Sequence, residues 1–228
     1  MPNLAENSKS YHEEADVYER FSQAEDTPKK ILNYLLPLVI DKNVLDLGCG
    51  SGKYLALAPF TRKYTGLDVS FDQLKIARQK AKNASNVEFI CSSAEKINLP
   101  NESQDIIIAA WVIGTILDED RRTKVVLEAQ RILKKQGNIY LVENDIGGDF
   151  EQIRGRYPNI TETKKYNDWL EKNGFTPINR FETHFEFDSL DEARNVFSSI
   201  WDQEAAKRIK NKRISHNIAI YTKTNTSP

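Results

Sequence analysis

Residues 43–56 read NVLDLGCGSGKYLA and place three alternating glycines, Gly48, Gly50 and Gly52, directly after a short apolar run. The apolar run predicts a buried strand, and the glycines predict a tight turn into a helix. Such a turn lets the backbone approach a ligand closely at the carboxyl end of a parallel strand, and the following helix offers free N–H groups. The stretch therefore predicts a ligand-binding loop in an α/β protein; the alternative is a tight strand–helix turn that binds nothing.

The order of the predicted elements gives the fold class. Short apolar runs alternate with amphipathic stretches through the first two thirds of the chain, which predicts a parallel sheet with helices on both faces. In the last third, two strands flank one helix and predict an antiparallel edge. Two helices are expected within residues 10–39, Gly137 and Gly174 are expected to end helices, and Ser70 and Ser189 to cap them. The predicted strands are 43–48, 64–69, 87–92, 105–112, 138–144, 176–187 and 217–223, and the later helices are 54–59, 70–84, 118–136, 161–173 and 189–211.

The composition limits the class of protein. The 228 residues carry a formal net charge of −1 and have a sequence pI of about 6.4, so no global basic field attracts nucleic acid. Cys49 and Cys91 are too few for a secreted disulfide scaffold, and we expect both to be free thiols in a reducing cytoplasm. The sequence shows no apolar signal core and no run of transmembrane length, so we expect a cytoplasmic protein without membrane contact.

Two carboxylates narrow the choice of ligand. Asp46 lies two positions before Gly48, where it would repel the pyrophosphate of a dinucleotide, and Lys53 stands where the third glycine of a G-x-G-x-x-G motif would fall. A ligand with positive charge tolerates Asp46 better, which weighs against a dehydrogenase. Asp68 follows Gly48 by 20 residues at the end of the second predicted strand, where an acidic side chain can accept hydrogen bonds from both hydroxyls of a ribose. The alternative for Asp68 is a charge at the N-terminus of the next helix.

These stretches resemble the motifs of the class I S-adenosylmethionine-dependent methyltransferases, and in particular the methyltransferase type 11 group. The motifs are VLDLGCGSG, GLDVS, SSAEKINLPNESQDIII and RILKKQGNIYLVE, and the close resemblance spans about residues 30–145. It implies a Rossmann-like, mostly parallel seven-stranded sheet with helices on both faces and an antiparallel C-terminal edge strand. It also implies a single methyltransferase domain over residues 1–228: an N-terminal helical cap at 1–40, a cofactor-binding core at 41–145, and an acceptor-side region with the C-terminal strands at 146–228.

The resemblance also implies a place for each part of S-adenosylmethionine. The methionine portion would lie on the glycine loop, the ribose at the end of the second strand, the adenine beside the loop after the third strand, and the sulfonium at the end of the fourth. A tyrosine of the N-terminal segment would close over the methionine carboxylate. The implied cofactor-binding residues are Tyr11, Tyr18, Asp46, Gly48, Cys49, Gly50, Gly52, Asp68, Val69, Ser93, Ala94, Glu95, Ala110 and Trp111.

The chain departs from the family pattern at two places. Ser93 stands where the family usually has an aspartate beside the adenine, and a hydroxyl makes a weaker contact with the adenine amino group than a carboxylate does. Residues 113–115 read IGT where the family often has a pair of histidines after the fourth strand, so any role of those histidines is absent.

Methyl transfer requires few specialised catalytic side chains. Methyl transfer from a sulfonium has an activated leaving group, so the enzyme mainly positions the acceptor and excludes water, and a base is needed only if the acceptor must lose a proton. His184, Asn144 and Asp145 are the candidates for a catalytic role, with an exposed or edge-strand position as the alternative for His184. His12 lies on an N-terminal segment that we expect to be mobile, and His216 is expected in a turn. No cluster has metal-ligand spacing, so no metal is expected.

The segment after the fifth strand, residues 143–160, is expected to shape the acceptor pocket. Trp111, Arg154, Arg156 and Tyr157 are the candidate substrate residues, and either arginine would bind a carboxylate or phosphate of the acceptor. The alternative is that this segment is a solvated loop.

Three functions are compatible with the sequence. The first is an enzyme that methylates a small-molecule acceptor by in-line displacement, acting as a monomer or homodimer without nucleic acid. The second is a methyltransferase acting on a protein or RNA, and the third is a non-catalytic S-adenosylmethionine-binding module. The basic run KRIKNKR at 207–213 is expected to be a solvated helix end, because no aromatic residue interleaves with it.

Overall fold

The computed structural model describes residues 9–155 and 161–226. The chain divides into two compact units. Unit 1 combines Met1–Ile31 with Glu143–Tyr221, and unit 2 combines Leu32–Val142 with Thr222–Pro228. Each unit is thus built from segments that are distant in the sequence. The predicted glycine loop lies in unit 2.

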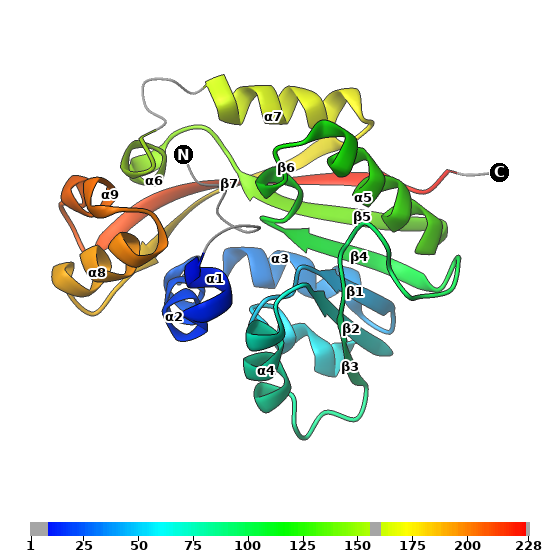
Figure 1. Cartoon of the computed structure of the whole chain (residues 1–228). Helices are drawn as coiled ribbons and strands as arrows, with labels where there is room; N and C mark the ends of the chain where they lie inside the picture. The colour runs from blue at the N-terminus through cyan, green and yellow to red at the C-terminus, as the bar shows by residue number, and fades with distance from the viewer. Residues whose placement is uncertain (1–8, 156–160, 227–228) are drawn as a thin grey trace. The chain divides into compact units, whose positions relative to one another are not determined.

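The strands form one seven-stranded sheet in the order β3-β2-β1-β4-β5-β7-β6 (Figure 1). The first five strands along the chain pair in parallel. β7 runs antiparallel to β5, since Asp145 N donates to Asn217 O near one end and Gln136 N donates to Asn225 O near the other. The predicted fold class is confirmed. The strands are β1 (Asn43–Leu47), β2 (Lys63–Asp68), β3 (Val87–Cys91), β4 (Gln104–Ala110), β5 (Leu133–Asn144), β6 (Thr176–Glu186) and β7 (Arg213–Thr224).

Helices connect the strands, and several begin as the sequence predicts. Ser70 Oγ accepts from Gln73 N at 3.4 Å, and Ser189 Oγ accepts from Glu192 N at 3.0 Å, so both serines are N-caps. The α-helices are α1 (Lys9–Glu13), α2 (Ala15–Ala24), α3 (Lys30–Val39), α4 (Phe71–Lys80), α5 (Glu119–Ile132), α6 (Gly148–Ile153), α7 (Thr161–Lys172), α8 (Leu190–Ile200) and α9 (Gln203–Arg208), and the 3-10 helices are η1 (Leu55–Phe60) and η2 (Ile113–Thr115).

Some predicted boundaries were wrong. α5 ends at Ile132, and Gly137 lies inside β5, where a Cβ atom would come within 2.9 Å of Asp105 O. Gly137 therefore permits close approach of a neighbouring strand and does not end the helix. The helix predicted over 189–211 is two helices, because Trp201 leaves helical geometry and Asp202 caps α9. The stretch 54–59 forms a 3-10 helix, and residues 10–39 contain three helices instead of two.

The two units have different cores. In unit 2 most residues of β1, β2 and β4 are buried, and β4 reads as an almost continuous aliphatic run over Ile106–Ala109. The core of unit 1 is an aromatic cluster in which Phe21 of α2 packs with Phe150 and Phe185 at centroid distances of 6.4 and 4.9 Å. The N-terminal segment is therefore packed through α2.

None of the helices in the described ranges has the length and hydropathy of a membrane span.

Candidate cofactor-binding site

The glycine loop leaves β1 in a conformation that glycine adopts readily. Gly48, Gly50 and Gly52 have φ angles of +73°, +52° and +87°, and the N–H groups of Gly48 and Cys49 both donate to Leu67 O at the end of β2. A Cβ atom on Gly48 would lie 2.2 Å from Val112 Cγ2, and one on Gly52 would lie 2.3 Å from a Leu55 methyl carbon. The loop is thus a backbone cradle with no room for side chains at two of its three glycines.

Asp68 ties the end of β2 to this loop. Its carboxylate is buried, and it accepts hydrogen bonds from Gly50 N at 2.9 Å and Ser70 N at 2.8 Å. The second bond satisfies an amide at the start of α4, so the alternative predicted for Asp68, a charge at a helix N-terminus, describes part of its role. The first bond places the carboxylate directly beside the glycine cradle, where the sequence predicts a ribose.

Asp46 supplies a second buried carboxyl group beneath the loop. It is 1% exposed, and the Tyr64 hydroxyl donates to its Oδ2 atom. Burial raises the pKa of Asp46 to about 7; the Tyr64 hydrogen bond opposes this rise, and the charge of Asp68 adds to it. The group is therefore poised to ionise near neutral pH, and a nearby cation would favour its charged form.

This pKa predicts how stability depends on pH. In the unfolded chain Asp46 loses its proton near pH 3.8, whereas in the folded chain it keeps the proton up to about pH 7. The folded state binds more protons between these values, so the free energy of unfolding falls as pH rises through the window. Asp46→Asn removes this term and keeps an oxygen that can accept from Tyr64. Melting temperatures of both proteins between pH 4 and 8 should show a shallower decline in the variant; parallel curves would contradict the prediction.

The edge next to Asp68 presents exposed apolar and polar groups. Cys91, the last residue of β3, pairs in register with Asp68, and Val69 is 57% exposed beside it. Ser93 is exposed, and its hydroxyl accepts from Glu95 N at 3.2 Å. Ala94 is half-buried between them. An apolar surface and a hydrogen-bonding edge therefore follow the acidic residue, as expected for a purine attached to a ribose.

The end of β4 has a strained backbone. Trp111 has a φ angle of +55°, which bulky residues rarely adopt, and its N–H donates to Val142 O at 2.9 Å. Lys53 of the glycine loop places its Nζ atom 4.8 Å from the centre of the Trp111 ring. Ala110, just before it, is half-buried. Sequence reasoning treated Lys53 only as a missing glycine and did not foresee this contact between the loop and the end of β4.

Asn144 and Asp145, two catalytic candidates of unit 1, each have a polar partner. Asn144 Oδ1 lies 2.8 Å from His216 Nε2, and Asp145 pairs with Arg180 at 2.9 Å. His216 is 1% exposed within β7, with Glu25 Oε1 3.2 Å from its Nδ1 atom, so the prediction that it lies in a turn was wrong. The strand simply begins four residues earlier than the apolar run suggested.

His184 lies on β6, the last strand of the sheet order, and this position fits the edge-strand alternative. Its Nε2 atom is 3.3 Å from Glu186 Oε2. Tyr11 and Tyr18 pack edge to face within unit 1, with ring centroids 4.7 Å apart, and Tyr11 is buried.

The segment after β5 differs from the solvated-loop alternative at Arg154. The guanidinium is buried and pairs with Glu151 at 3.0 Å, and Thr163 also donates to Glu151, at 2.9 Å. The solvated-loop alternative is wrong here, because residues 148–153 form α6 and Arg154 stabilises the interior of unit 1. The candidate residues Arg156 and Tyr157 lie outside the described residues. Within the described ranges, no three His, Cys, Asp or Glu side chains gather in a group that could hold a metal.

Comparison with known proteins matches the part of the chain that holds the glycine loop to methyltransferases. A family model described as a methyltransferase domain matches residues 45–141. The chain is 27% identical over 205 residues to the uncharacterized protein MJ1252 of Methanocaldococcus jannaschii, covering 74% of this chain and 77% of that one. It is 32% identical over 114 residues to the tRNA (carboxymethyluridine(34)-5-O)-methyltransferase of Arabidopsis thaliana, covering 49% of this chain and 26% of that one. It is 29% identical over 109 residues to the ubiquinone/menaquinone biosynthesis C-methyltransferase UbiE of Escherichia coli, covering 45% of this chain and 42% of that one. The match thus spans less than half the length of these last two relatives.

Solved structures share the fold. The crystal structure of YcgJ from Bacillus subtilis superposes with a TM-score of 0.61 at 18% identity and covers 86% of this chain and 98% of that one. The N-methyltransferase NodS from Bradyrhizobium japonicum, in complex with S-adenosyl-L-homocysteine, superposes with a TM-score of 0.57 at 16% identity and covers 88% and 87%.

The geometry fits the cofactor of this family. The backbone of the loop turns at three glycines with positive φ angles, Asp46 suits a ligand with positive charge, and Asp68 and Val69 offer an acid and an apolar surface in succession. With the family match over residues 45–141, the chain contains a methyltransferase domain of the S-adenosylmethionine-dependent class, whose cofactor is S-adenosylmethionine.

Proposed function

We propose that this methyltransferase acts on a small-molecule acceptor and binds S-adenosylmethionine along the carboxyl ends of β1 to β4. The proposal rests on the arrangement of Asp46, the glycine cradle and Asp68. Asp46 is buried and accepts from Tyr64 of the neighbouring strand, and Asp68 is buried and accepts from Gly50 N of the cradle. A ligand with a cationic amino-acid end and a ribose matches both groups.

Each predicted cofactor-binding residue has a role in this proposal. The backbone of Gly48, Cys49 and Gly50, with Gly52 supporting the turn, would hold the methionine portion, and Asp46 would favour its positive charge. Asp68 would accept from the ribose hydroxyls. Val69, Ser93, Ala94 and Glu95 would surround the adenine. Ala110 and Trp111 would lie beside the sulfonium, and Tyr11 or Tyr18 would cover the methionine carboxylate.

The bound cofactor supplies a methyl group on a sulfonium, which is a good leaving group. The chain's own residues then have to position the acceptor and keep water out. Trp111 would provide an apolar wall for this purpose. Asn144 and Asp145 remain the candidates to orient the acceptor, and His184 the candidate base if the acceptor must lose a proton.

A small acceptor is favoured by the charge of the chain and by one relative. The net charge of −1 provides no general attraction for a polyanion, and UbiE is by name a C-methyltransferase of quinone biosynthesis. The competing acceptor is RNA, because another relative is by name a tRNA methyltransferase. The exposed basic residues of segment 207–213 are the surface that RNA would use, although Lys207 already pairs with Glu204 at 2.7 Å.

An acceptor screen separates these possibilities. The purified chain and S-adenosylmethionine with a labelled methyl group are incubated in parallel with a metabolite extract, total tRNA and a protein extract. We expect label in the metabolite fraction only, and none with Asp68→Ala. Label in tRNA or in protein would replace the proposed acceptor class. Absence of label in every fraction, with cofactor binding intact, would favour a non-catalytic binding module.

A further inference from the structure

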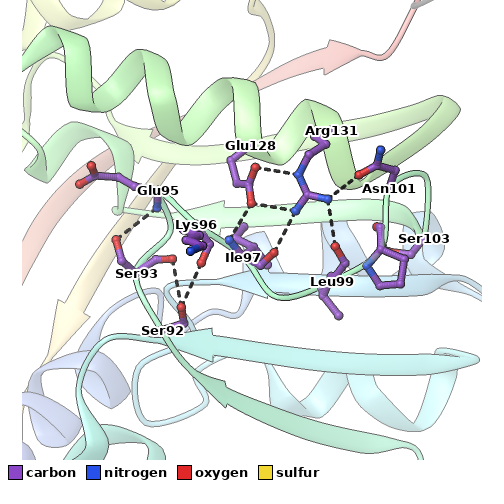
Figure 2. A network of polar contacts seen from close by, with 11 residues as sticks. Ser92, Ser93, Glu95, Lys96, Ile97, Leu99, Asn101, Ser103, Glu128 and Arg131 are labelled. Atoms are coloured by element: carbon purple, nitrogen blue, oxygen red, sulfur yellow. Dashed lines mark hydrogen bonds and ion pairs between the residues drawn. The ribbon is translucent and has the colours of Figure 1, made fainter.

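One arginine contacts the loop between β3 and β4, residues 92–103, at three points. This loop has no helix or strand, so its backbone polar groups need partners from elsewhere. Arg131, in the last turn of α5, donates to Ile97 O at 2.9 Å, to Leu99 O at 3.0 Å and to Asn101 Oδ1 at 2.6 Å (Figure 2). One planar guanidinium therefore fixes three successive points along the loop.

Glu128 holds that guanidinium in place. It lies one turn before Arg131 on α5, and its two oxygens accept from Arg131 Nε at 2.8 Å and Nη2 at 2.7 Å. The same carboxylate accepts from Ile97 N at 2.7 Å, so both polar backbone groups of Ile97 are bound by this pair (Figure 2). The ion pair keeps the pKa of Glu128 below its ordinary value, mainly through the Arg131 hydrogen bond.

The other half of the loop adjoins the proposed nucleoside site. Ser92 N donates to Asp68 O at 3.0 Å, and the Ser92 hydroxyl donates to Lys96 O at 3.0 Å. Glu95 pairs with Arg121, near the start of α5, at 2.6 Å. The loop is therefore joined to Asp68 at its start and to α5 at two later points. The residues between these anchors, Ser93 to Glu95, come directly after the strand that pairs with the Asp68 strand.

We propose that Arg131 and Glu128 are positioning residues for recognition of the cofactor's base. They fix residues 92–103 so that the polar groups of Ser93–Glu95 stand at the edge of the purine bound next to Asp68. The inference rests on the proposed cofactor site and adds two residues that sequence reasoning missed. Their spacing of three on one helix was the available signal, but it predicts only an ordinary surface ion pair.

This role predicts a change in selectivity as well as in affinity. A site that hydrogen-bonds a polar group discriminates against an analogue that presents a different group, because its own polar atoms are then left unpaired. Loosening the loop removes that discrimination, while the glycine cradle and Asp68 still hold the rest of the ligand. A residue that contributes only to global stability would weaken binding of both ligands equally.

The experiment compares two ligands that differ only at the Watson–Crick edge of the purine, in the group at position 6 and the proton on N1. S-adenosylhomocysteine and S-inosylhomocysteine are titrated by calorimetry into the wild type, Arg131→Leu, Arg131→Lys and Glu128→Gln. We expect the wild type to prefer the adenine ligand by about tenfold or more, the equivalent of one good hydrogen bond, and Arg131→Leu to bring the ratio of Kd values close to one. Arg131→Lys and Glu128→Gln should give intermediate ratios, because each leaves part of the network.

Arg62→Leu is the matched control, since Arg62 also pairs with an acid in unit 2 but does so at an exposed site, with Asp41 at 3.1 Å. It should leave the ratio unchanged. An unchanged ratio in Arg131→Leu, or no base preference in the wild type, would overturn the inference. If Arg131→Leu does not fold, the ratio in Glu128→Gln decides. Failure of the wild type to bind either ligand would instead refute the proposed cofactor site.

Discussion

Gly48→Ala is expected to lower the melting temperature by about 5–15 °C and to abolish cofactor binding. The backbone at Gly48 has a φ angle of +73°, where an L-residue costs about 1–2 kcal/mol. The added Cβ would also lie 2.2 Å from Val112 Cγ2, and overpacking of this kind costs about 1–3 kcal/mol. Thermal unfolding measures the sum, at about 2–4 °C per kcal/mol for a chain of this size.

Two control variants separate the steric cost from the conformational cost. Val112→Ala alone removes the methyl group nearest to the loop, and the double variant with Gly48→Ala tests whether removing the clash restores stability. We expect partial recovery of the melting temperature, because the strained φ angle remains. A Gly48→Ala protein that melts within 2 °C of the wild type would show that the loop is free to relax.

Asp68→Ala is expected to weaken S-adenosylmethionine binding by about a hundredfold. Two ribose hydroxyls bound to a carboxylate are each worth about 1.5 kcal/mol or more, and a total near 3 kcal/mol corresponds to that factor. The variant also leaves Gly50 N and Ser70 N without their acceptor, which loosens the cradle itself. Isothermal titration calorimetry on the folded variant measures the loss.

Asp72→Ala is the matched control for this prediction. Asp72 lies in the first turn of α4, four residues after Asp68, and is exposed. Its removal takes away the same charge from the same region and should change the Kd by less than about threefold, since an exposed charge interacts weakly across solvent. A Kd for Asp68→Ala within the same limit would exclude the proposed ribose contact.

The parallel half of the sheet and its glycine loop could be predicted because local and global signals agree there. A strand buried on both faces must be apolar over its whole length, as Ile106–Ala109 are, and a turn with φ angles above zero favours glycine. Both constraints act on consecutive residues and leave a pattern in the sequence.

The contacts of His216, Arg154 and Arg131 could not be predicted in the same way. Glu25 lies beside His216, and the carbonyl groups of Ile97 and Leu99 accept from Arg131, so these partners are distant in the chain. Arg154 pairs with Glu151 three residues earlier, but this Glu151 also accepts from Thr163. A polar residue in a sequence looks exposed until its partner is known. At Gly137 the sequence pattern was misleading. A glycine after a helical stretch usually marks the end of the helix, but this glycine permits close approach between two strands.

Because unit 1 combines an early and a late segment of the chain, its core cannot form until synthesis is well advanced. Phe21 and Ala24 of α2 leave the ribosome early, yet the aromatic cluster that buries them draws its other members from Phe150 onward. The strands of unit 2 pair with neighbours that follow closely in synthesis, so this unit can complete its sheet core while α2 is still waiting for its partners. Until then the apolar face of α2 is exposed on the nascent polypeptide, where a chaperone can bind it.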